Sequence, residues 1–489
     1  MDCHILYEIL RKSRAYFKLP CEAGHSQRPD LPHGSYTKKI RINTSVEKLF
    51  AWHEGKGAVL RLTPPWVPLK MIARSGDGIK KGTRLRFRIK LFSIPLTWES
   101  EHIDYQKNRF FKDRQIKGPF SKWEHSHVFK SDGAHGSIME DKIEFQLPLG
   151  ILNGLFYGFV MNEFKRLFTY RHRVLKYDLE HYADLTGRKK RILISGAGGL
   201  IGSALVPFLR TCGHEVIRLV RKKKELLKDA LFWDPYAGIL DLGQAGDIDA
   251  VINLNGVNIT DRRWTEKRKK LIFDSRIIPT RLLAEKAAGL DHVPDVFLSA
   301  SAIGFYGNTG DRSVSEKDAM GDFFLSSVCR QWEDASVSAL KRKGIRCVHL
   351  RTGVVLSPAG GALAKMVLPF RTGLGAQISH GRQYMSWISI DDALSGILHI
   401  LNHDKIEGPV NLTGPCPATN REFSQTLSRV FSKKLFLSVP ESMAKILWGE
   451  MGKETLLAST RVMPEKLLNS GFHFQHKTLL PALKDLLGR

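Results

Sequence analysis

The stretch Arg191-Ile-Leu-Ile-Ser-Gly-Ala-Gly-Gly-Leu-Ile-Gly202 decides the fold of the second half of this 489-residue chain. Its apolar run at 192–194 predicts a buried strand, and the residues after it predict a helix. Gly196, Gly199 and Gly202 lie between the two. A turn without Cβ atoms lets backbone N–H groups and a helix N-terminus approach a phosphate. Since such a turn usually follows the first strand of its domain, the residues before it should form a separate domain.

Strands and helices alternate from residue 191 onward. The predicted strands, separated by helical patterns, are 191–195, 215–220, 250–255, 296–301 and 347–351. This alternation is typical of an α/β fold with a doubly wound parallel sheet. We therefore predict a nucleotide-binding Rossmann domain and, after it, a small domain rich in helices; their expected bounds are 191–435 and 436–489.

The end of the second predicted strand indicates which dinucleotide binds. A site for NAD usually has Asp or Glu there to hold the ribose 2′-hydroxyl, whereas this chain has Arg221 and Lys222, followed by two more lysines. A guanidinium suits a 2′-phosphate, so NADP is favoured over NAD, with Arg218 as a weaker candidate. The alternative is a solvated run of charges at a helix start.

The first part of the chain is rich in predicted strands. We expect strands at 36–42, 83–91, 96–105, 109–113, 123–130 and 137–146. Ser45 predicts the N-cap of a short helix, and 150–182 predicts a long amphipathic helix. These elements predict an α+β domain in which a curved sheet grips a helix. Its expected bounds are 34–183, after an N-terminal lead at 1–33 and before a polar linker at 184–190.

This first domain resembles the START-like (SRPBCC) family of cyclase and lipid-binding domains. The resemblance is carried by 118–127, 141–150 and the helix at 164–179. It implies a helix-grip fold with a cavity for an apolar ligand; the alternative is a cavity filled by side chains in an interaction module. His125 and His127 share one face of a strand, but no third ligand is evident. We therefore expect polar residues at the cavity rim and no metal site.

The second half resembles extended or atypical short-chain dehydrogenases/reductases, and among them the NAD-dependent epimerase/dehydratase-like proteins that carry their own C-terminal domain. The motifs that carry this resemblance are 196–202, 232–235, 251–256, 263–266, 274–276, 299–307, 332–333, 351–353, 385–392 and 457–461. It implies that the cofactor is bound by Gly196, Gly199, Leu200, Ile201, Gly202, Asn255 and Gly256. The family more often has Ala where this chain has Asn255.

The same resemblance implies a catalytic serine and a Tyr–Lys pair, in which the lysine lowers the pKa of the tyrosine. Ser301 matches the serine. The region of the Tyr–Lys pair contains neither residue, and Cys329 and Arg330 are the nearest substitutes. Tyr306 is then the nearest candidate acid/base, unless it is a packed aromatic residue. A lone Cys in an apolar helical pattern is more typical of a core.

Two functions follow from these motifs. The chain is either an NADP-dependent oxidoreductase or nucleotide-sugar epimerase-like enzyme acting on a small molecule, or a non-catalytic NADP-responsive sensor that lacks the Tyr–Lys pair. The net charge of +26 would also suit a nucleic-acid or anionic membrane surface. No nucleic-acid-binding signature accompanies that charge, so we expect no specific nucleic-acid partner. The sequence leaves substrate and oligomeric state open.

The expected compartment is the cytoplasm. The six cysteines contain no CxxC pair, which favours reduced thiols over a disulfide framework. The first ten residues lack the long apolar core of a signal peptide. The apolar run at 147–161 is short and interrupted by glycine, so we expect no transmembrane segment.

Overall fold

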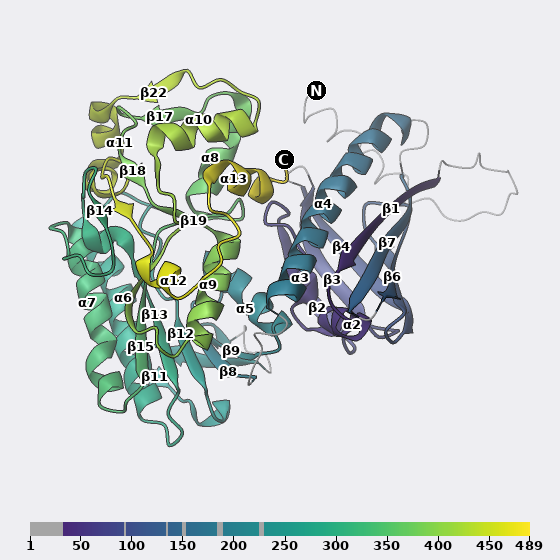
Figure 1. Ribbon diagram of the computed structural model, residues 1–489, viewed down its shortest axis with the longest axis horizontal. Coiled ribbons are helices and arrows are strands. Elements are labelled where there is room, and N and C mark those ends of the chain that lie inside the picture. Colours follow the sequence, from purple (N-terminus) through teal and green to yellow (C-terminus); the bar gives the residue numbers. More distant parts are fainter. Residues whose placement is uncertain (1–32, 92–93, 134, 149–152, 183–188, 224–228) are drawn as a thin grey trace, which may run out of the picture. The chain divides into compact units, whose positions relative to one another are not determined.

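A computed structural model describes residues 33–91, 94–133, 135–148, 153–182, 189–223 and 229–489 (Figure 1). The chain divides into two compact units, Met1–Asp184 and Leu185–Leu487. The predicted lead, apart from His33, and most of the predicted linker lie outside the described residues. Within the described part of the chain, no helix combines the length and apolar character needed to cross a bilayer.

The N-terminal unit is a seven-stranded antiparallel sheet with helices on one face (Figure 1). The strands, with spatial order β1-β7-β6-β5-β4-β3-β2, are β1 (His33–Ile42), β2 (Leu69–Ser75), β3 (Arg84–Leu91), β4 (Ile94–Gln106), β5 (Phe110–Lys117), β6 (Lys122–Asp132) and β7 (Gly136–Gln146). The helices are α2 (Val46–Glu54), α3 (Ala58–Arg61) and α4 (Asn153–His181). All six predicted strands are confirmed to within a few residues.

The period-two pattern of these strands explains why the sheet has a buried face. In β6, Trp123, His125, His127 and Phe129 alternate with less buried residues, so their side chains share the face that packs toward the helices. Ser45 caps α2 as predicted, since its side chain accepts a hydrogen bond from the Lys48 amide. Strand β2 was not predicted, because only three of its residues are even half-buried and its alternation is weak.

The second unit is built on an eight-stranded sheet whose order is β11-β10-β9-β8-β12-β13-β15-β20. These strands are β8 (Arg191–Ser195), β9 (Glu215–Val220), β10 (Ala230–Asp234), β11 (Ile239–Leu240), β12 (Ala250–Asn253), β13 (Val296–Ala302), β15 (Arg346–Thr352) and β20 (Gly408–Leu412). The helices are α5 (Leu200–Thr211), α6 (Glu266–Ala288), α7 (Phe324–Lys341), α8 (Gly361–Thr372), α9 (Ile390–Asn402), α10 (Asn420–Val430), α11 (Glu441–Thr455), α12 (Glu465–Asn469) and α13 (Leu479–Leu487).

All pairings in this sheet are parallel except that of β10 with β11. The predicted α/β doubly wound sheet is therefore confirmed. The strands at its centre read as continuous apolar runs because helices cover both faces, and Ile192, Leu193 and Ile194 are all 0% exposed. Strands β10 and β20 were not predicted as members of the sheet. Their short, mixed sequences become strands only beside β9 and β15.

Four short two-stranded pairings join segments of the second unit, and two of them bring segments after residue 436 to earlier ones. The pairs are β14 (Ser313–Val314) with β23 (Arg461–Val462), β16 (Val354–Leu356) with β19 (Trp387–Ser389), β17 (Ala376–Ile378) with β22 (Leu437–Val439), and β18 (Tyr384–Met385) with β21 (Ala418–Thr419). Trp387, on β19, is 0% exposed and belongs to the core.

A buried histidine ties the C-terminal residues to α9. The ring of His476, 3% exposed, has Nε2 2.9 Å from Asp485 Oδ2 and Nδ1 3.0 Å from Ser389 Oγ. Asp392 accepts hydrogen bonds from the Gln475 and His476 amides and from Ser389 Oγ. Ser389 is the N-cap of α9, and Asp392 lies in its first turn.

This histidine should make stability fall in alkaline solution. Burial opposes its charge, but Asp392 and Asp485 raise the pKa of His476 to about 9. The folded state therefore holds a proton that the unfolded chain releases near its ordinary pKa of about 6.5. The stabilisation should be complete below about pH 6.5 and lost as the pH rises through about 9, by on the order of 3 kcal/mol. Urea unfolding of wild type and His476→Gln across this range measures it.

The exposed His473 provides the control, since it lies in the same segment. His473→Gln should keep the alkaline loss of stability, and His476→Gln should remove it. Equal pH dependence in wild type and His476→Gln would refute the assignment.

Candidate functional site

The predicted nucleotide site lies at the carboxyl ends of β8 and β12. The chain passes from β8 to β9 and β10 on one side of the sheet and then returns to β12 on the other side, so the strand order reverses between β8 and β12. Ligands bind at such a point because the loops that leave the two strands diverge and open a crevice. Gly196 follows β8 and Leu254 follows β12. A Cβ at Gly196 would lie only 2.5 Å from the Leu254 carbonyl oxygen, so the glycine turn lies at this crevice.

Two of the three motif glycines are required by backbone contacts. Gly196 has φ of 75°, a left-handed conformation that side chains disfavour. A Cβ at Gly202 would lie 2.3 Å from the Gly196 carbonyl oxygen and 2.8 Å from the Ala197 Cα atom. Gly202 therefore lets the first turn of α5 pack directly against the loop. At Gly199 the same carbonyl would be 3.3 Å away, a tight contact that a small shift relieves.

The start of α5 has the properties of an anion cradle. Its N-cap, Gly199, supplies no side-chain hydrogen bond, and its first turn contains no acidic residue. The first amides of a helix have no partners within the helix, and the aligned peptide dipoles place partial positive charge there. Gly198 and Gly199, which directly precede these amides, are exposed. The turn thus fits the pyrophosphate of a dinucleotide.

A second glycine segment lies beside the first. Gly360 and Gly361 connect β16 to α8, and a Cβ at either one would lie 3.1 Å from a methyl group of Leu200. This later glycine segment therefore contacts the first turn of α5 directly. The Leu200 side chain packs against the loop, so its amide rather than its side chain is available to a cofactor.

Asn255, a predicted cofactor residue, uses its side chain to join the two strands of the crevice. Its Nδ2 donates to Ser195 Oγ and to Asn253 Oδ1, both at 2.6 Å. Ser195 Oγ donates in turn to Asn253 Oδ1 at 2.8 Å. The side-chain amide of Asn255 therefore fastens the end of β12 to β8.

Arg276 is a residue of this site to which the sequence assigned no role. It lies on α6, its Nη2 donates to the Val257 carbonyl, and a Cβ at Gly256 would lie 3.1 Å from its Cζ atom. Its guanidinium stacks on the Trp332 ring, and burial lowers the pKa of Arg276 to about 10. Gly256 has φ of 151°, a conformation that residues with side chains rarely adopt, and the Arg276 guanidinium leaves little room for a Cβ there. Arg276 belongs to the 274–276 motif, but its contact with Gly256 could not be predicted because the two residues are far apart in the sequence.

The basic residues predicted to select NADP follow β9. Arg221, Lys222 and Lys223 are exposed at its carboxyl end, and Lys223 lies 5.7 Å from the centre of the Phe232 ring. Arg218 differs, because it donates to Asp229 Oδ1 at 3.0 Å. Arg218 is therefore occupied by an internal ion pair, and Arg221 is the better placed group for a 2′-phosphate.

The two predicted catalytic hydroxyls belong to one buried network. Ser301 Oγ donates to Glu333 Oε1 at 2.7 Å, and Arg351 donates to both Glu333 oxygens at 2.9 Å. Arg351 Nη1 also donates to the Tyr306 hydroxyl at 3.0 Å, and that hydroxyl donates to Asn411 Oδ1 at 2.7 Å. The structure therefore brings Ser301 and Tyr306 together, but through an ion pair that the sequence did not suggest.

This network favours structural over catalytic use of both hydroxyls. Tyr306 is 3% and Ser301 4% exposed. Burial raises the pKa of Tyr306 to about 12 although Arg351 acts in the opposite direction, so the phenol stays protonated at neutral pH. Cys329 is a core residue, as its pattern predicted, and burial raises the pKa of its thiol to about 11. Arg330 is exposed and pairs with Asp334. Neither substitutes for a Tyr–Lys pair.

The N-terminal unit encloses a separate cavity of about 260 Å³ between its sheet and its helices. Most of the lining is apolar and includes Val59, Leu62, Leu85, Phe87, Trp98 and Leu167. His125 and His127 line it too, and each is 3% exposed. The prediction that they are rim residues without a third partner is wrong. Neighbouring strands place Asp113 beside them, because Asp113 is paired with His125 in the register of β5 and β6.

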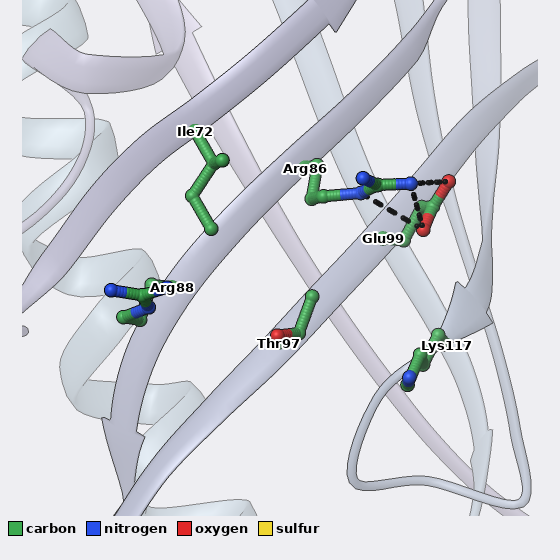
Figure 2. A pocket seen from close by; sticks show the side chains of 6 residues that line it. All are labelled: Ile72, Arg86, Arg88, Thr97, Glu99 and Lys117. Atoms are coloured by element: carbon green, nitrogen blue, oxygen red, sulfur yellow. Dashed lines mark hydrogen bonds and ion pairs between the residues drawn. The ribbon is translucent and has the colours of Figure 1, made fainter.

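The opposite face of this sheet carries a shallow basic hollow of about 400 Å³. Figure 2 shows its lining, in which Arg86 is directed at Glu99 while Arg88 and Lys117 lie farther from that carboxylate. The ion pair between Arg86 and Glu99 is 3.2 Å long. On β3, Arg86 and Arg88 of the hollow alternate with residues that line the cavity. This strand therefore presents an apolar face to the cavity and a basic face to the hollow.

The crevice and its glycine turn define a Rossmann-type NAD(P)-binding protein. Residues 192–412 match the model of the NAD dependent epimerase/dehydratase family, and 439–486 match a domain of unknown function (DUF1731). An epimerase family protein of Mycobacterium bovis is 44% identical over 292 residues, which are 60% of this chain and 96% of that protein. The chain belongs to the NAD-dependent epimerase/dehydratase family.

Two solved structures are informative. The nucleoside-diphosphate sugar epimerase from Corynebacterium glutamicum is 30% identical, with a TM-score of 0.75, over 93% of this chain and 90% of that chain. Human epimerase family protein SDR39U1 (isoform 2) with NADPH is 32% identical, with a TM-score of 0.55, over 60% of this chain and 98% of that chain. The first match covers far more of this chain than the second and so extends into the N-terminal unit.

Proposed function

We propose that the second unit binds NADP at the crevice between β8 and β12, with the 2′-phosphate held by Arg221 and Lys222. The observation that carries this proposal is the glycine turn, whose closest backbone contacts exclude side chains and leave the first amides of α5 open. The presence of NADPH in the human relative supports the choice of dinucleotide. The backbones of Leu200, Ile201, Asn255 and Gly256 would complete the cradle.

We further propose that this chain senses its cofactor rather than turning it over through the standard Tyr–Lys pair. When bound, the cofactor would accept a hydride in its oxidised form, NADP⁺, and donate one in its reduced form, NADPH. Proton transfer would need a titratable group beside it, and Tyr306 and Ser301 are committed to the Glu333–Arg351 ion pair. The competing function, sugar-nucleotide epimerisation or carbonyl reduction with another acid/base, is favoured by similarity to a nucleoside-diphosphate sugar epimerase.

The N-terminal unit is proposed to be a START-like ligand-binding domain. The supporting observations are the antiparallel sheet, the long helix α4 and the largely apolar cavity between them. Its ligand would be a small molecule with a predominantly apolar surface, since hydrophobic side chains form most of the lining.

Fluorescence titration of the full chain with NADPH and with NADH tests the cofactor proposal. Saturable binding of NADPH, tighter than that of NADH, supports it, and absence of binding to either refutes it. Incubation with NADP and a panel of nucleoside-diphosphate sugars and small carbonyl compounds, followed by product analysis by NMR, separates the two functions. Formation of an epimer or a reduced product would favour the enzyme.

Arg221→Asp should reverse the preference between the two dinucleotides. The carboxylate would repel a 2′-phosphate and accept a hydrogen bond from a ribose 2′-hydroxyl, so NADPH affinity should fall at least about tenfold while NADH affinity rises. The dissociation constants from the same titration measure both changes. Arg342→Asp is the matched control, because exposed Arg342 follows α7 and leads into the amino end of β15. An unchanged ratio in Arg221→Asp would refute the role of Arg221.

A further inference from the structure

The wall of the N-terminal cavity contains a group of metal-ligating side chains. Asp113 on β5 and His125 and His127 on β6 each offer a ligand atom, and these atoms all lie within 4.8 Å of one another. The antiparallel register places Asp113 opposite His125, and His127 follows two residues later on the same face. Three groups from two adjacent strands therefore converge at one point of the cavity wall.

A second carboxylate lies behind the two histidines. Asp141 on β7 has Oδ1 3.0 Å from Nε2 of His125 and 2.7 Å from Nδ1 of His127. Its other oxygen, Oδ2, is 2.6 Å from Nε2 of His172 on α4. Asp141 is 0% exposed, and its two oxygens lie within 3.0 Å of three imidazole nitrogens. Asp141 therefore lies directly behind both rings.

This arrangement leaves a nitrogen of His125 for another partner. Its Nε2 is hydrogen-bonded to Asp141, and its Nδ1 lies 3.8 Å from Asp113 Oδ1. Nδ1 of His127 lies 2.7 Å from the same Asp141 oxygen but makes no hydrogen bond among the described residues. Metal-ligating histidines commonly hold a carboxylate on their second nitrogen, which sets the tautomer and the ring orientation. Asp141 thus fixes the ring of His125 and lies beside the ring of His127.

Two other polar groups of this cavity, on Asp113 and His102, lack hydrogen-bond partners among the described residues. The Asp113 carboxylate makes no hydrogen bond there, and its oxygen is 3.8 Å from Nδ1 of His125, too far for one. Its side chain is only 13% exposed. In the same cavity, Nδ1 of His102 is buried without a hydrogen bond among the described residues. Buried polar groups without partners are costly, so this point of the cavity is suited to a bound cation.

We propose that Asp113, His125 and His127 bind one divalent transition-metal ion of the Zn²⁺ or Fe²⁺ class. Two imidazoles and one carboxylate are the protein ligands typical of such ions when a coordination position remains open. The three side chains line the cavity, so that open position faces the apolar space. A small molecule with a donor atom at one end would bind the ion through that atom, and its apolar body would fill the cavity.

Cobalt provides a direct probe, because protein-bound Co²⁺ with few ligands absorbs visible light more strongly than Co²⁺ in water. Untagged full-length protein is treated with a chelator, loaded with Co²⁺, passed through a desalting column and assayed by metal analysis and visible absorption. One Co²⁺ per chain with an intense visible band, displaced by Zn²⁺, is expected. A spectrum equal to that of aqueous Co²⁺, or no retained metal, would overturn the proposal.

Variants then assign the ligands. Asp113→Asn and His127→Gln should each weaken Co²⁺ binding at least about 100-fold, and Asp141→Asn should weaken it about 10- to 100-fold by releasing the rings. The control is His53→Gln, which changes another buried histidine of the same cavity whose Nδ1 is bonded to the Leu49 carbonyl. Near-ultraviolet circular dichroism verifies that each variant is folded. Equal metal loss in His53→Gln and His127→Gln would refute the ligand set.

Discussion

Gly202→Ala should abolish tight dinucleotide binding and destabilise the second unit. The added Cβ would lie 2.3 Å from the Gly196 carbonyl oxygen and 3.0 Å from the carbonyl carbon, both backbone atoms at the point where β8 meets α5. A flexible side chain could move away, but this carbonyl belongs to a turn that is itself packed against Leu254. The loop must shift away from the helix and carry its amides out of register with a phosphate.

The expected size follows from the cost of overpacking. Forcing extra atoms into a packed interior costs about 1–3 kcal/mol, and moving the cradle should lower NADPH affinity by more than about tenfold. Thermal unfolding and NADPH titration measure the two effects separately. If the variant is too unstable to titrate, Gly196→Ala tests the same turn through the Leu254 contact.

Gly198 is the matched control, because it lies in the same loop and a Cβ there would meet nothing within 4 Å. Gly198→Ala should unfold at the wild-type temperature. Equal stability of the Gly198 and Gly202 variants would contradict the contact that we assign to Gly202.

Glu333→Ala should cause a large loss of stability, because Glu333 is the anion of the buried network that contains Ser301 and Tyr306. Glu333 is 6% and Arg351 4% exposed, and two hydrogen bonds of 2.9 Å join them. Removing the carboxylate would leave the guanidinium buried without its anion, which costs about 3–5 kcal/mol. Urea unfolding measures the change.

The neighbouring pair supplies the control for this experiment. Asp334 and Arg330 lie on the same helix as Glu333, one and three residues away from it. Their side chains are 54% and 58% exposed. Asp334→Ala should therefore lower the free energy of unfolding by less than about 1 kcal/mol. Comparable losses in Glu333→Ala and Asp334→Ala would mean that the buried pair contributes little. Because the pair also holds Tyr306 and Ser301, NADPH binding that persists in a folded Glu333→Gln variant would support its structural role.

This ion pair joins Ser301 to residues of two other elements. Ser301 and Arg351 are paired in the register of β13 and β15, so the serine at the end of its strand faces a cation on the next strand. Glu333 comes from α7, which begins in the region where the family resemblance implies a Tyr–Lys pair. The buried ion pair therefore holds both Ser301 and Tyr306, which supports our proposal that the chain does not use the standard pair.

Short-range signals were sufficient for much of this protein. Apolar runs, glycine spacing and helix caps act within a few residues, and they predicted β8, the turn after it, α5 and the capped helix at Ser45. The antiparallel strands of the N-terminal unit were also predicted, because alternation is a property of neighbouring residues. The role that we propose for Arg221 was predicted in the same way, since it depends on the place of this residue directly after a strand.

Contacts between residues far apart in the chain could be decided only by tertiary structure. Arg276 reaches Gly256 from α6, Glu333 reaches Ser301 from α7, and Asp113 reaches His125 across two strands. Each partner is set by strand register and helix packing, which depend on the whole core rather than on local pattern. The sequence by itself therefore determined the two kinds of fold and the nucleotide turn. Tertiary structure decided that the expected catalytic hydroxyls are buried and that the two supposed rim histidines are buried beside Asp113.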